Sequence, residues 1–293
     1  MFERILVPLD GSRLAETALP YAEELAGAFN SEVILIGVCE PAEEQYHHMH
    51  QLYIEKMAEL VKSHIKGGTR VKVKSVSLVG ELAQEIIDYA EESSISLVVM
   101  TTHGRSGIMP WAMGSIANRV LPRIKIPILL IRAEVPSSKV GEGGGFSRIL
   151  VTLDGSEAGE AALLYVRELA EKLSSEVILL QVVAPGQHVY TVGGLDYVVF
   201  TDQQVESMKT QAKQYLEKVT KKLTGISVSS EVRVGDAARE IIRFADETNT
   251  SLVAISSHGR SGIKQWIFGS VTHKILQAGN MSVLLVKAPG AEM

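Results

Sequence analysis

The sequence has few of the features that mark secreted, membrane-bound or disulfide-stabilised proteins. Its 293 residues include one cysteine, Cys39, so no disulfide can form within the chain. There is no run of about 18 consecutive apolar residues, which a membrane-spanning helix would need. The first residues lead into an apolar segment without a basic leader region. We therefore expect a cytoplasmic protein that has no membrane partner.

Basic residues are also few. The chain has 29 Lys and Arg against 34 Asp and Glu, which gives a net charge of −5. Nucleic acids are recognised through clustered Lys and Arg, so we expect no nucleic-acid partner. Two well-known phosphate-binding patterns are missing as well: Gly-x-x-x-x-Gly-Lys-Ser/Thr, and Gly-x-Gly-x-x-Gly after the first strand. Their absence argues against a P-loop hydrolase and a dinucleotide dehydrogenase.

The sequence does contain an internal repeat. Residues 5–12 (ILVPLDGS) recur at 149–156 as ILVTLDGS, and residues 103–108 (HGRSGI) recur unchanged at 258–263. The offset between copies rises from 144 to 155, so the second half carries 11 additional residues. We expect them within 184–200, as a surface loop marked by two adjacent glycines. The repeat predicts a first domain over 1–133, a flexible linker rich in Gly and Ser over 134–146, and a second domain over 147–293.

Within each half, short β-branched runs alternate with longer segments of helical period. This order predicts an α/β fold, with two tandem Rossmann-like domains that each have a five-stranded parallel-type sheet and flanking helices. Strands are expected at 4–9, 32–38, 71–77, 97–102 and 128–132, and again at 148–153, 176–182, 227–234, 252–256 and 282–286. Helices of the first half are expected at 14–29, 44–66, 82–93 and 115–124.

The loops after the first strands carry a repeated Asp-Gly-Ser sequence. Ligands of open parallel sheets bind outside the carboxyl ends of the strands, and this sequence lies there. In both Asp10-Gly11-Ser12 and Asp154-Gly155-Ser156, the serine can cap the next helix while the aspartate reaches a ligand hydroxyl or ring nitrogen. The aspartate can equally be a plain turn or cap residue.

A glycine-rich stretch follows the fourth strand of each half. It runs from Thr101 to Gly107, and Gly114-Ser115 then opens a helix. Glycines let backbone N–H groups approach phosphate oxygens, and a helix N-terminus adds free donors, so the stretch predicts a phosphate cradle. The alternative is a glycine-rich turn with a serine N-cap. His103 can contact a phosphate or transfer a proton, although packing within the turn is its simpler role.

These motifs resemble the universal stress protein family in its tandem two-domain form. Besides the opening motif, the family's Gly-x2-Gly-x9-Gly-Ser/Thr pattern occurs as Thr101-x2-Gly104-x9-Gly114-Ser115 and again from Ser256 to Ser270, with Thr101 and Ser256 in place of the first glycine. The resemblance implies a fold of the adenine nucleotide alpha hydrolase type and no catalytic residues. It implies that the ligand is ATP, ADP or AMP, with or without Mg²⁺, and that Asp10 and Asp154 contact its adenine or ribose. The implied binding residues are Pro8, Asp10, Val38, Met100, Thr101, His103, Gly104, Gly107, Gly114, Ser115, Ile116, Asp154, Val182, Ser256, Gly259, Gly262, Gly269, Ser270 and Val271.

The resemblance leaves three functional hypotheses open. The first is a nucleotide-binding stress-response or signalling module that is not an enzyme. The second is a weak ATPase or phosphotransfer enzyme, and the third is a dimerisation scaffold that binds no nucleotide. Because family members pair through their last strands, segments 128–132 and 282–286 are expected to form an intramolecular pseudo-dimer, and the whole chain could pair further as a homodimer.

One cluster of histidines needs a separate interpretation. His47, His48 and His50 lie near Glu43 and Glu44, which suggests a metal site. On a helix, residues 47 and 50 share a face while 48 points elsewhere, and the surrounding residues are polar. We therefore interpret the cluster as a solvated helix face and predict no metal.

Overall fold

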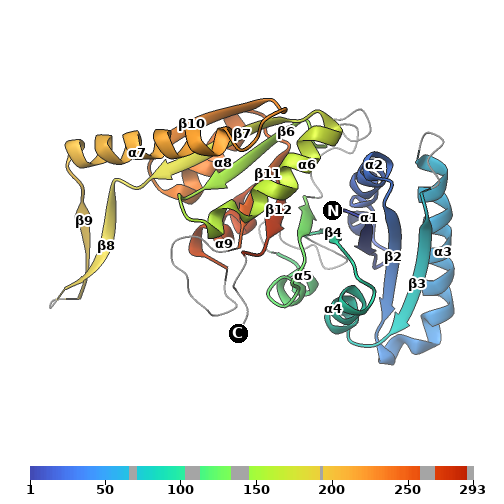
Figure 1. The fold of residues 1–293 in the computed structure, drawn as a ribbon. Helices are drawn as coiled ribbons and strands as arrows, with labels where there is room; N and C mark the ends of the chain where they lie inside the picture. Colours follow the sequence, from blue (N-terminus) through green and yellow to red (C-terminus); the bar gives the residue numbers. More distant parts are fainter. Residues whose placement is uncertain (66–70, 103–112, 133–144, 192–193, 258–267, 289–293) are drawn as a thin grey trace.

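A computed structural model describes residues 1–65, 71–102, 113–132, 145–191, 194–257 and 268–288. One ten-stranded sheet runs through both halves in the order β10-β7-β6-β11-β12-β5-β4-β1-β2-β3 (Figure 1). Its strands are β1 (Arg4–Pro8), β2 (Glu32–Cys39), β3 (Val73–Val79), β4 (Leu97–Thr101), β5 (Ile128–Ile131), β6 (Arg148–Leu153), β7 (Glu176–Val183), β10 (Val228–Val234), β11 (Leu252–Ser256) and β12 (Ser282–Val286). The predicted α/β class is confirmed.

The two halves share one topology and meet edge to edge. Within each half the five strands pair in parallel, and the first strand lies in the middle. Between the halves, β12 pairs with β5 antiparallel, with Leu284 opposite Leu129. The predicted pairing of the last strands is confirmed, and it covers two edges that would otherwise expose unpaired N–H and C=O groups.

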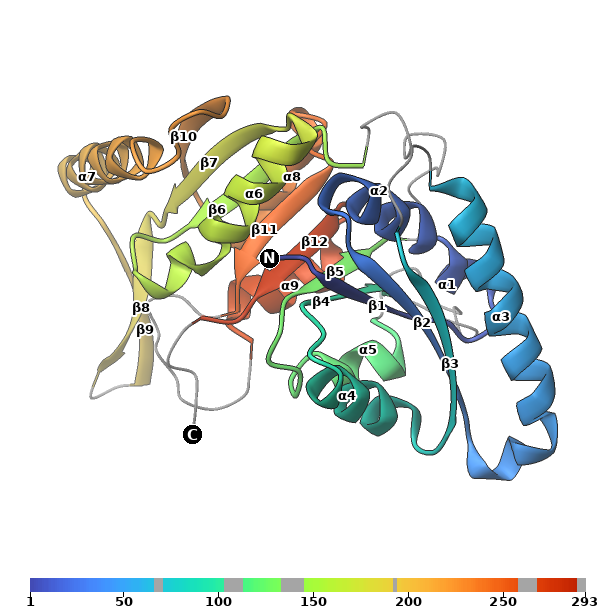
Figure 2. The same cartoon turned by 45° about the vertical axis from the view of Figure 1, so that its right-hand side comes forward.

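Helices cover both faces of the sheet, as right-handed crossovers require. They are α1 (Arg13–Glu16), α2 (Leu19–Phe29), α3 (His47–His64), α4 (Leu82–Glu92), α5 (Ser115–Val120), α6 (Leu163–Leu173), α7 (Asp202–Thr220), α8 (Ala237–Glu247) and α9 (Ser270–Ala278), with 3₁₀ turns η1 (Pro41–Tyr46) and η3 (Ala158–Ala162). Buried residues of α1, α2, α3, α6 and α7 pack on one face, and those of α4, α5, α8 and α9 pack on the other (Figure 2).

Proline explains where the helices depart from the prediction. The helix expected over 14–29 is divided into α1 and α2, because Pro20 in the first turn of α2 has no N–H to continue a preceding helix. The helix expected over 44–66 begins with η1, which has Pro41 at its start, and continues as α3. The helix expected over 115–124 ends at Val120, two residues before Pro122. Proline therefore accounts for the start of α2, the start of η1 and the end of α5.

The insertion of the second half is a β-hairpin, so the prediction of a loop is wrong. Strand β8 (Gly186–Thr191) pairs antiparallel with β9 (Gly194–Val199), and the hairpin projects away from the sheet (Figure 1, yellow). Residues 192 and 193, between the strands, lie outside the described residues. The segment has β-branched and aromatic residues on both sides of a Gly-Gly pair, which is typical of a hairpin.

Aromatic residues near the chain start and the second half help to hold the halves together. The Phe2 ring lies 5.0 Å from Phe29 and 5.9 Å from Tyr165 of α6, and the Tyr21 ring lies 5.8 Å from Phe146. Phe2 and Phe146 are both 1% exposed, so Phe146, the last residue of the predicted linker, is packed in the core. One apolar core therefore continues from α2 to α6 across the junction.

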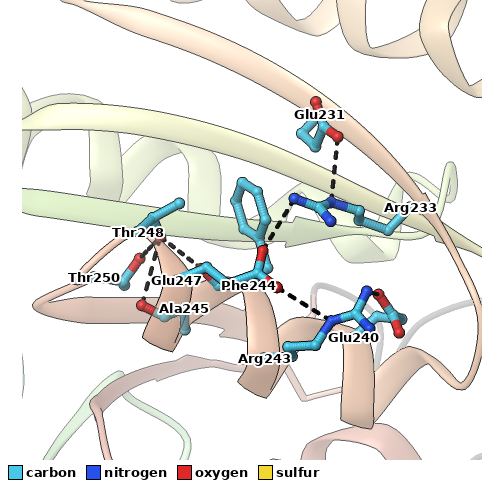
Figure 3. Close-up of polar contacts among 9 residues, drawn as sticks. All are labelled: Glu231, Arg233, Glu240, Arg243, Phe244, Ala245, Glu247, Thr248 and Thr250. Carbon is cyan, nitrogen blue, oxygen red and sulfur yellow. Dashed lines mark hydrogen bonds and ion pairs between the residues drawn. The ribbon is translucent and has the colours of Figure 1, made fainter.

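Helix α8 is held against β10 by a charged network that Figure 3 shows. Arg233 of β10 pairs with Glu231 at 3.2 Å and with Glu247 of α8 at 3.2 Å, and its guanidinium lies 4.8 Å from the centre of the Phe244 ring. Arg243 pairs with Glu247 at 3.3 Å. This network fixes the side of α8 that faces β10. No helix of the described residues is long and apolar enough to cross a membrane.

Candidate functional site

Each half has a cavity at the carboxyl ends of its strands. The cavity of the first half measures about 250 Å³ and that of the second about 260 Å³. We call them the first and the second cavity. Each lies where the ends of the first, second and fourth strands of its half meet the start of the last helix, which is where ligands of open parallel sheets bind.

The two cavities have equivalent walls. All fourteen residues that line the second cavity occupy repeat positions whose counterparts line the first. In the first cavity these are Pro8, Leu9, Asp10, Ala15, Ile36, Val38, Leu82, Ile86, Met100, Thr101, Gly114, Ser115, Ile116 and Ala117. In the second they are Thr152, Leu153, Asp154, Gly159, Leu180, Val182, Ala237, Ile241, Ile255, Ser256, Gly269, Ser270, Val271 and Thr272.

The structure therefore brings the described candidate residues together in two groups. Those of the first half, from Pro8 to Ile116, all line the first cavity, and those of the second, from Asp154 to Val271, all line the second. Five candidates, namely His103, Gly104, Gly107, Gly259 and Gly262, lie outside the described residues.

The Asp-Gly-Ser turns are built as the sequence predicts. Gly11 and Gly155 have φ angles of 81° and 85°, in the left-handed region that favours glycine. Ser12 caps α1 by accepting a hydrogen bond from the Ala15 N–H at 3.1 Å. Asp10 Oδ1 in turn accepts the Ser12 N–H at 2.9 Å. The aspartate thus stabilises the turn and also lines the cavity, so the turn role and a ligand role are compatible.

The second half repeats this turn. Asp154 Oδ1 accepts both the N–H and the hydroxyl of Ser156, at 3.0 and 2.6 Å. Gly159 lies so close that a Cβ there would be 2.5 Å from Asp154 Oδ1. The equivalent residue in the first half is Ala15, whereas the glycine of the second half leaves room for the carboxylate of Asp154.

The glycines before α5 and α9 use their own N–H groups within the loop. Gly114 donates to the Thr102 carbonyl at 2.6 Å, and Gly269 donates to the Ser257 carbonyl at 3.2 Å. As the N-cap residues they have no side chain to cap the helix. The first three residues of each helix, whose N–H groups have no partner within the helix, line the cavities. The donors available to an anion are therefore those of the helix start rather than those of the glycines.

In the second half, Ser256 stands in place of the first glycine of the motif, and its hydroxyl makes a hydrogen bond within the protein. Ser256 is 5% exposed, and its Oγ donates to the Ala158 carbonyl at 2.7 Å. This bond ties the end of β11 to η3. The hydroxyl thus stabilises the wall of the second cavity. Thr101, in the first half, is 8% exposed and lines the first cavity.

The helices that form the remaining wall are capped by carboxylates. Asp236 accepts the Arg239 N–H at 3.0 Å at the start of α8, and Lys274 of α9 donates to it at 3.2 Å. The backbone hydrogen bond, followed by the lysine contacts, lowers the pKa of Asp236 below its ordinary value despite some burial. Glu81 caps α4 in the same way through the N–H groups of Ala83 and Gln84.

The first cavity differs from the second by a polar extension. Glu40 and Glu43, from the segment between β2 and α3, line it in addition, as do His50 of the first turn of α3 and Thr102. Glu43, His50 and the buried Cys39 have potential metal-ligand atoms that all lie within 4.8 Å of one another. In the sequence, Cys39 stands at the end of an apolar run, where a cysteine is most often a buried apolar residue and not a ligand. The spacing Cys-x3-Glu-x6-His across a strand end and a helix start was the available indication.

The second half has a third cavity, of about 470 Å³, beside its insertion. It lies on the opposite face of β7 from the second cavity, between β7, the hairpin and α7. Gln181, which is 5% exposed, and Ala212 of α7 both line it, and Gln181 Oε1 has no hydrogen-bond partner. The buried residues of α3 (Ile54, Ala58 and Val61) have the same spacing as those of α7 (Ala212, Leu216 and Val219), so Gly37 and Ile54 are the first-half counterparts of Gln181 and Ala212. An exchange of small and large residues has therefore opened a space that Ile54 fills in the first half.

Comparison with known proteins agrees with the repeat. The model of the family described as "Universal stress protein family" matches residues 1–132 and 145–287. Universal stress protein YxiE of Bacillus subtilis is 31% identical over 149 residues, which are 48% of this chain and 99% of that protein. A universal stress protein of Mycolicibacterium smegmatis is 21% identical and is matched over 97% of this chain and 96% of its own length.

The solved structures extend the agreement to the arrangement of both halves. The crystal structure of a universal stress protein from Archaeoglobus fulgidus superposes with a TM-score of 0.73 at 21% identity, covering 98% of this chain and 99% of that one. At 21% identity, this structural similarity supports the fold alone. With the family model matching both repeats, the chain belongs to the universal stress protein family, in its tandem two-domain form.

Proposed function

We propose that each half of this universal stress protein binds one adenine nucleotide and that the chain acts as a nucleotide-binding stress-response or signalling module. The observation that carries the proposal is the equivalence of the two cavities, whose fourteen shared positions include every described candidate residue. A wall kept in both repeats, despite an 11-residue insertion beside one of them, is expected of a binding site rather than of two unrelated surface hollows.

The chemistry of the walls fits the parts of a nucleotide. Apolar side chains, among them Ile36, Val38 and Met100, offer a slot for the flat base. The carboxylates of Asp10 and Asp154 are acceptors for ribose hydroxyls. In the second half, the nine-residue helix α9 begins at the cavity with Ser270, and its first N–H groups and its dipole favour phosphate.

A nucleotide has been seen in one related protein. A solved universal stress protein in complex with cAMP covers 45% of this chain at 20% identity, with a TM-score of 0.37. That ligand belongs to that protein. The proposal for this chain depends on its own two cavities.

The test is a calorimetric titration of the full chain with ATP, ADP and AMP, with two sites expected. Gly114→Val and Gly269→Val should each remove one site, because a branched side chain would enter the cavity wall. The control is Gly27→Val in α2, because a Cβ at Gly27 meets no heavy atom within 4 Å. The control should keep both sites.

Two outcomes would favour the other hypotheses. If millimolar ATP, ADP and AMP all give no heat, and acid releases no nucleotide from the purified protein, the chain is a scaffold that binds no nucleotide. If ATP is hydrolysed above background and Gly114→Val abolishes the turnover, the chain is an enzyme. No lysine or arginine is among the described residues that line either cavity, so we expect no turnover.

A further inference from the structure

We propose that Cys39, Glu43 and His50 form a binding site for one transition-metal dication, of which Zn²⁺ is the best match. The site lies in the connection from β2 to α3, at the lower right of Figure 2. Cys39 is the last residue of β2, Glu43 belongs to η1, and His50 lies in the first turn of α3. The proposal does not depend on nucleotide binding.

The geometry brings three different ligand types into contact range. The Cys39 sulfur, a Glu43 carboxylate oxygen and a His50 ring nitrogen all lie within 4.8 Å of one another. Among the described residues, no other group of three or more Cys, His, Asp or Glu side chains has its ligand atoms so close together. Rotations of the Glu43 and His50 side chains would allow all three ligand atoms to lie about 2.0–2.3 Å from one Zn²⁺ ion, as zinc bonds require.

The kinds of ligand select the kind of metal. Mg²⁺ and Ca²⁺ prefer sets of oxygen ligands, whereas a set with one sulfur, one nitrogen and one oxygen suits Zn²⁺ and its neighbours. Metal binding would displace the thiol proton of Cys39 to solvent. The resulting thiolate and the Glu43 carboxylate would then balance the two positive charges of the ion.

The local fold already holds the cysteine in place. Cys39 is 1% exposed, and its Sγ lies 3.1 Å from the carbonyl oxygen of Glu43 and 3.7 Å from that of Glu40. The η1 turn thus wraps around the sulfur. His50 is half-buried and Glu43 is exposed, so an ion can reach these two ligands from solvent.

Three protein ligands leave one position of a tetrahedral ion open. Glu43 and His50 both line the first cavity, as does Glu40, so a bound ion would lie in its wall. Water or an oxygen atom of the cavity's ligand can take the fourth position, as in zinc sites that keep one open place.

The second half provides an internal comparison. Val183 stands at the repeat position of Cys39, and the hairpin of β8 and β9 replaces the η1 turn. A valine cannot bind a metal. Two of the four residues of the polar extension, Glu43 and His50, thus belong to a site that the second half lacks, and we expect one ion per chain rather than two.

The test is a titration of the metal-free full chain with ZnCl2, without nucleotide, followed by calorimetry. Wild type should bind one Zn²⁺ per chain. Cys39→Ala and His50→Ala should each weaken binding by more than about tenfold, because loss of even an outer partner of a metal ligand costs 10–100-fold. His48→Ala removes an exposed histidine of the same helix and should bind as wild type does.

A second measurement separates this site from adventitious binding and from misfolding. Co²⁺ in place of Zn²⁺ should give a thiolate charge-transfer band that Cys39→Ala abolishes, while circular dichroism shows that both variants remain folded. Absence of the band in wild type would overturn the proposal. Equal Zn²⁺ affinity of wild type, Cys39→Ala and His50→Ala would overturn it as well.

Discussion

Lys287 donates a hydrogen bond from its Nζ to the carbonyl oxygen of Pro122, at 3.1 Å, across 165 residues of sequence. Lys287 follows the last strand of the second half, and Pro122 follows the last helix of the first half. The ammonium group is thus half-buried at the junction. Burial, and next the repulsion from Lys125, lower the pKa of Lys287 to about 8 from its ordinary value of 10.5.

This depressed pKa predicts that stability rises with pH. Below pH 8 the lysine is charged in both the folded and the unfolded chain, and the folded chain bears the cost of burying it. Between about pH 8 and 10.5 the folded chain loses the proton while the unfolded chain retains it, so the free energy of unfolding increases.

The variant Lys287→Met tests this prediction. The methionine keeps most of the apolar stem and removes the charge, so the variant should be more stable than wild type at pH 7, by roughly 1 kcal/mol after solvent screening. Its advantage should shrink as the pH rises from 8 to 10. Urea unfolding of both proteins at each pH measures the difference. A difference that does not change with pH would contradict the assigned pKa.

The junction itself depends on the pair Leu129 and Leu284. They lie opposite each other where β5 meets β12, and they are 2% and 1% exposed. Leu284→Glu would bury a carboxylate between the halves, so we expect a loss of more than about 3 kcal/mol in the free energy of unfolding. Denaturant unfolding measures it.

A surface leucine serves as the control for that experiment. Leu164 of α6 is 59% exposed, so Leu164→Glu should change the stability by less than about 0.5 kcal/mol. Equal effects of the two variants would show that the β5–β12 pair does not hold the halves together.

The fold could be predicted from the sequence largely because the strands are buried on both faces. Such strands are continuous apolar runs, and their bounds in the structure differ little from those predicted. The repeat then fixed which segments are equivalent. The Asp-Gly-Ser turns were predictable for a local reason, since Gly11 and Gly155 need a conformation that glycine adopts easily.

Features that depend on contacts between segments were not predictable in this way. The proximity of Cys39 to His50 requires the η1 turn to fold back over the end of β2, which residue periodicity does not reveal. The Gly-Gly pair predicts a surface loop, whereas the segments on either side of it pair as β8 and β9. The equivalence of the two cavity walls likewise depends on the structure, because each wall combines strand ends and helix starts that are far apart in the sequence.

The cap of α8 allows a third prediction. Asp236→Ala removes the side chain that accepts the Arg239 N–H, so it should cost about 0.5–2 kcal/mol of the free energy of unfolding at pH 7. Because the pKa of Asp236 is lowered in the folded chain, this contribution is present above the ordinary value of 3.8 and is lost as the pH falls further. The free energies of unfolding of the variant and of wild type should therefore become more alike as the pH falls below 3.8.

The exposed Asp246, near the other end of the same helix, is the matched control. Asp246→Ala should change the stability by less than about 0.5 kcal/mol at pH 7. Thermal unfolding of the three proteins from pH 7 to pH 3 provides the comparison. A gap between Asp236→Ala and wild type that stays constant down to pH 3 would be inconsistent with the cap.

The fourth prediction concerns the pair Gly37 and Ile54. In the second half, the position equivalent to Gly37 carries a side chain, that of Gln181. A Cβ at Gly37 would lie 2.7 Å from Cγ1 and 2.9 Å from Cδ1 of Ile54, whose side chain is 1% exposed and cannot move aside freely. Gly37→Ala should therefore destabilise the protein by about 1–3 kcal/mol through over-packing. In the second half, Gln181 occupies the equivalent place and lines a cavity together with Ala212.

A double-mutant cycle tests whether the two positions depend on each other. Ile54→Ala alone should cost about 2–5 kcal/mol, because it leaves a cavity above the glycine. Once Ile54 is alanine, Gly37→Ala should cost little or stabilise, since its methyl group enters that cavity. The double variant should thus be more stable than the sum of the single effects predicts, by at least about 1 kcal/mol. Additive effects in denaturant unfolding would mean that the two residues do not compete for one space, and that the third cavity of the second half has another origin.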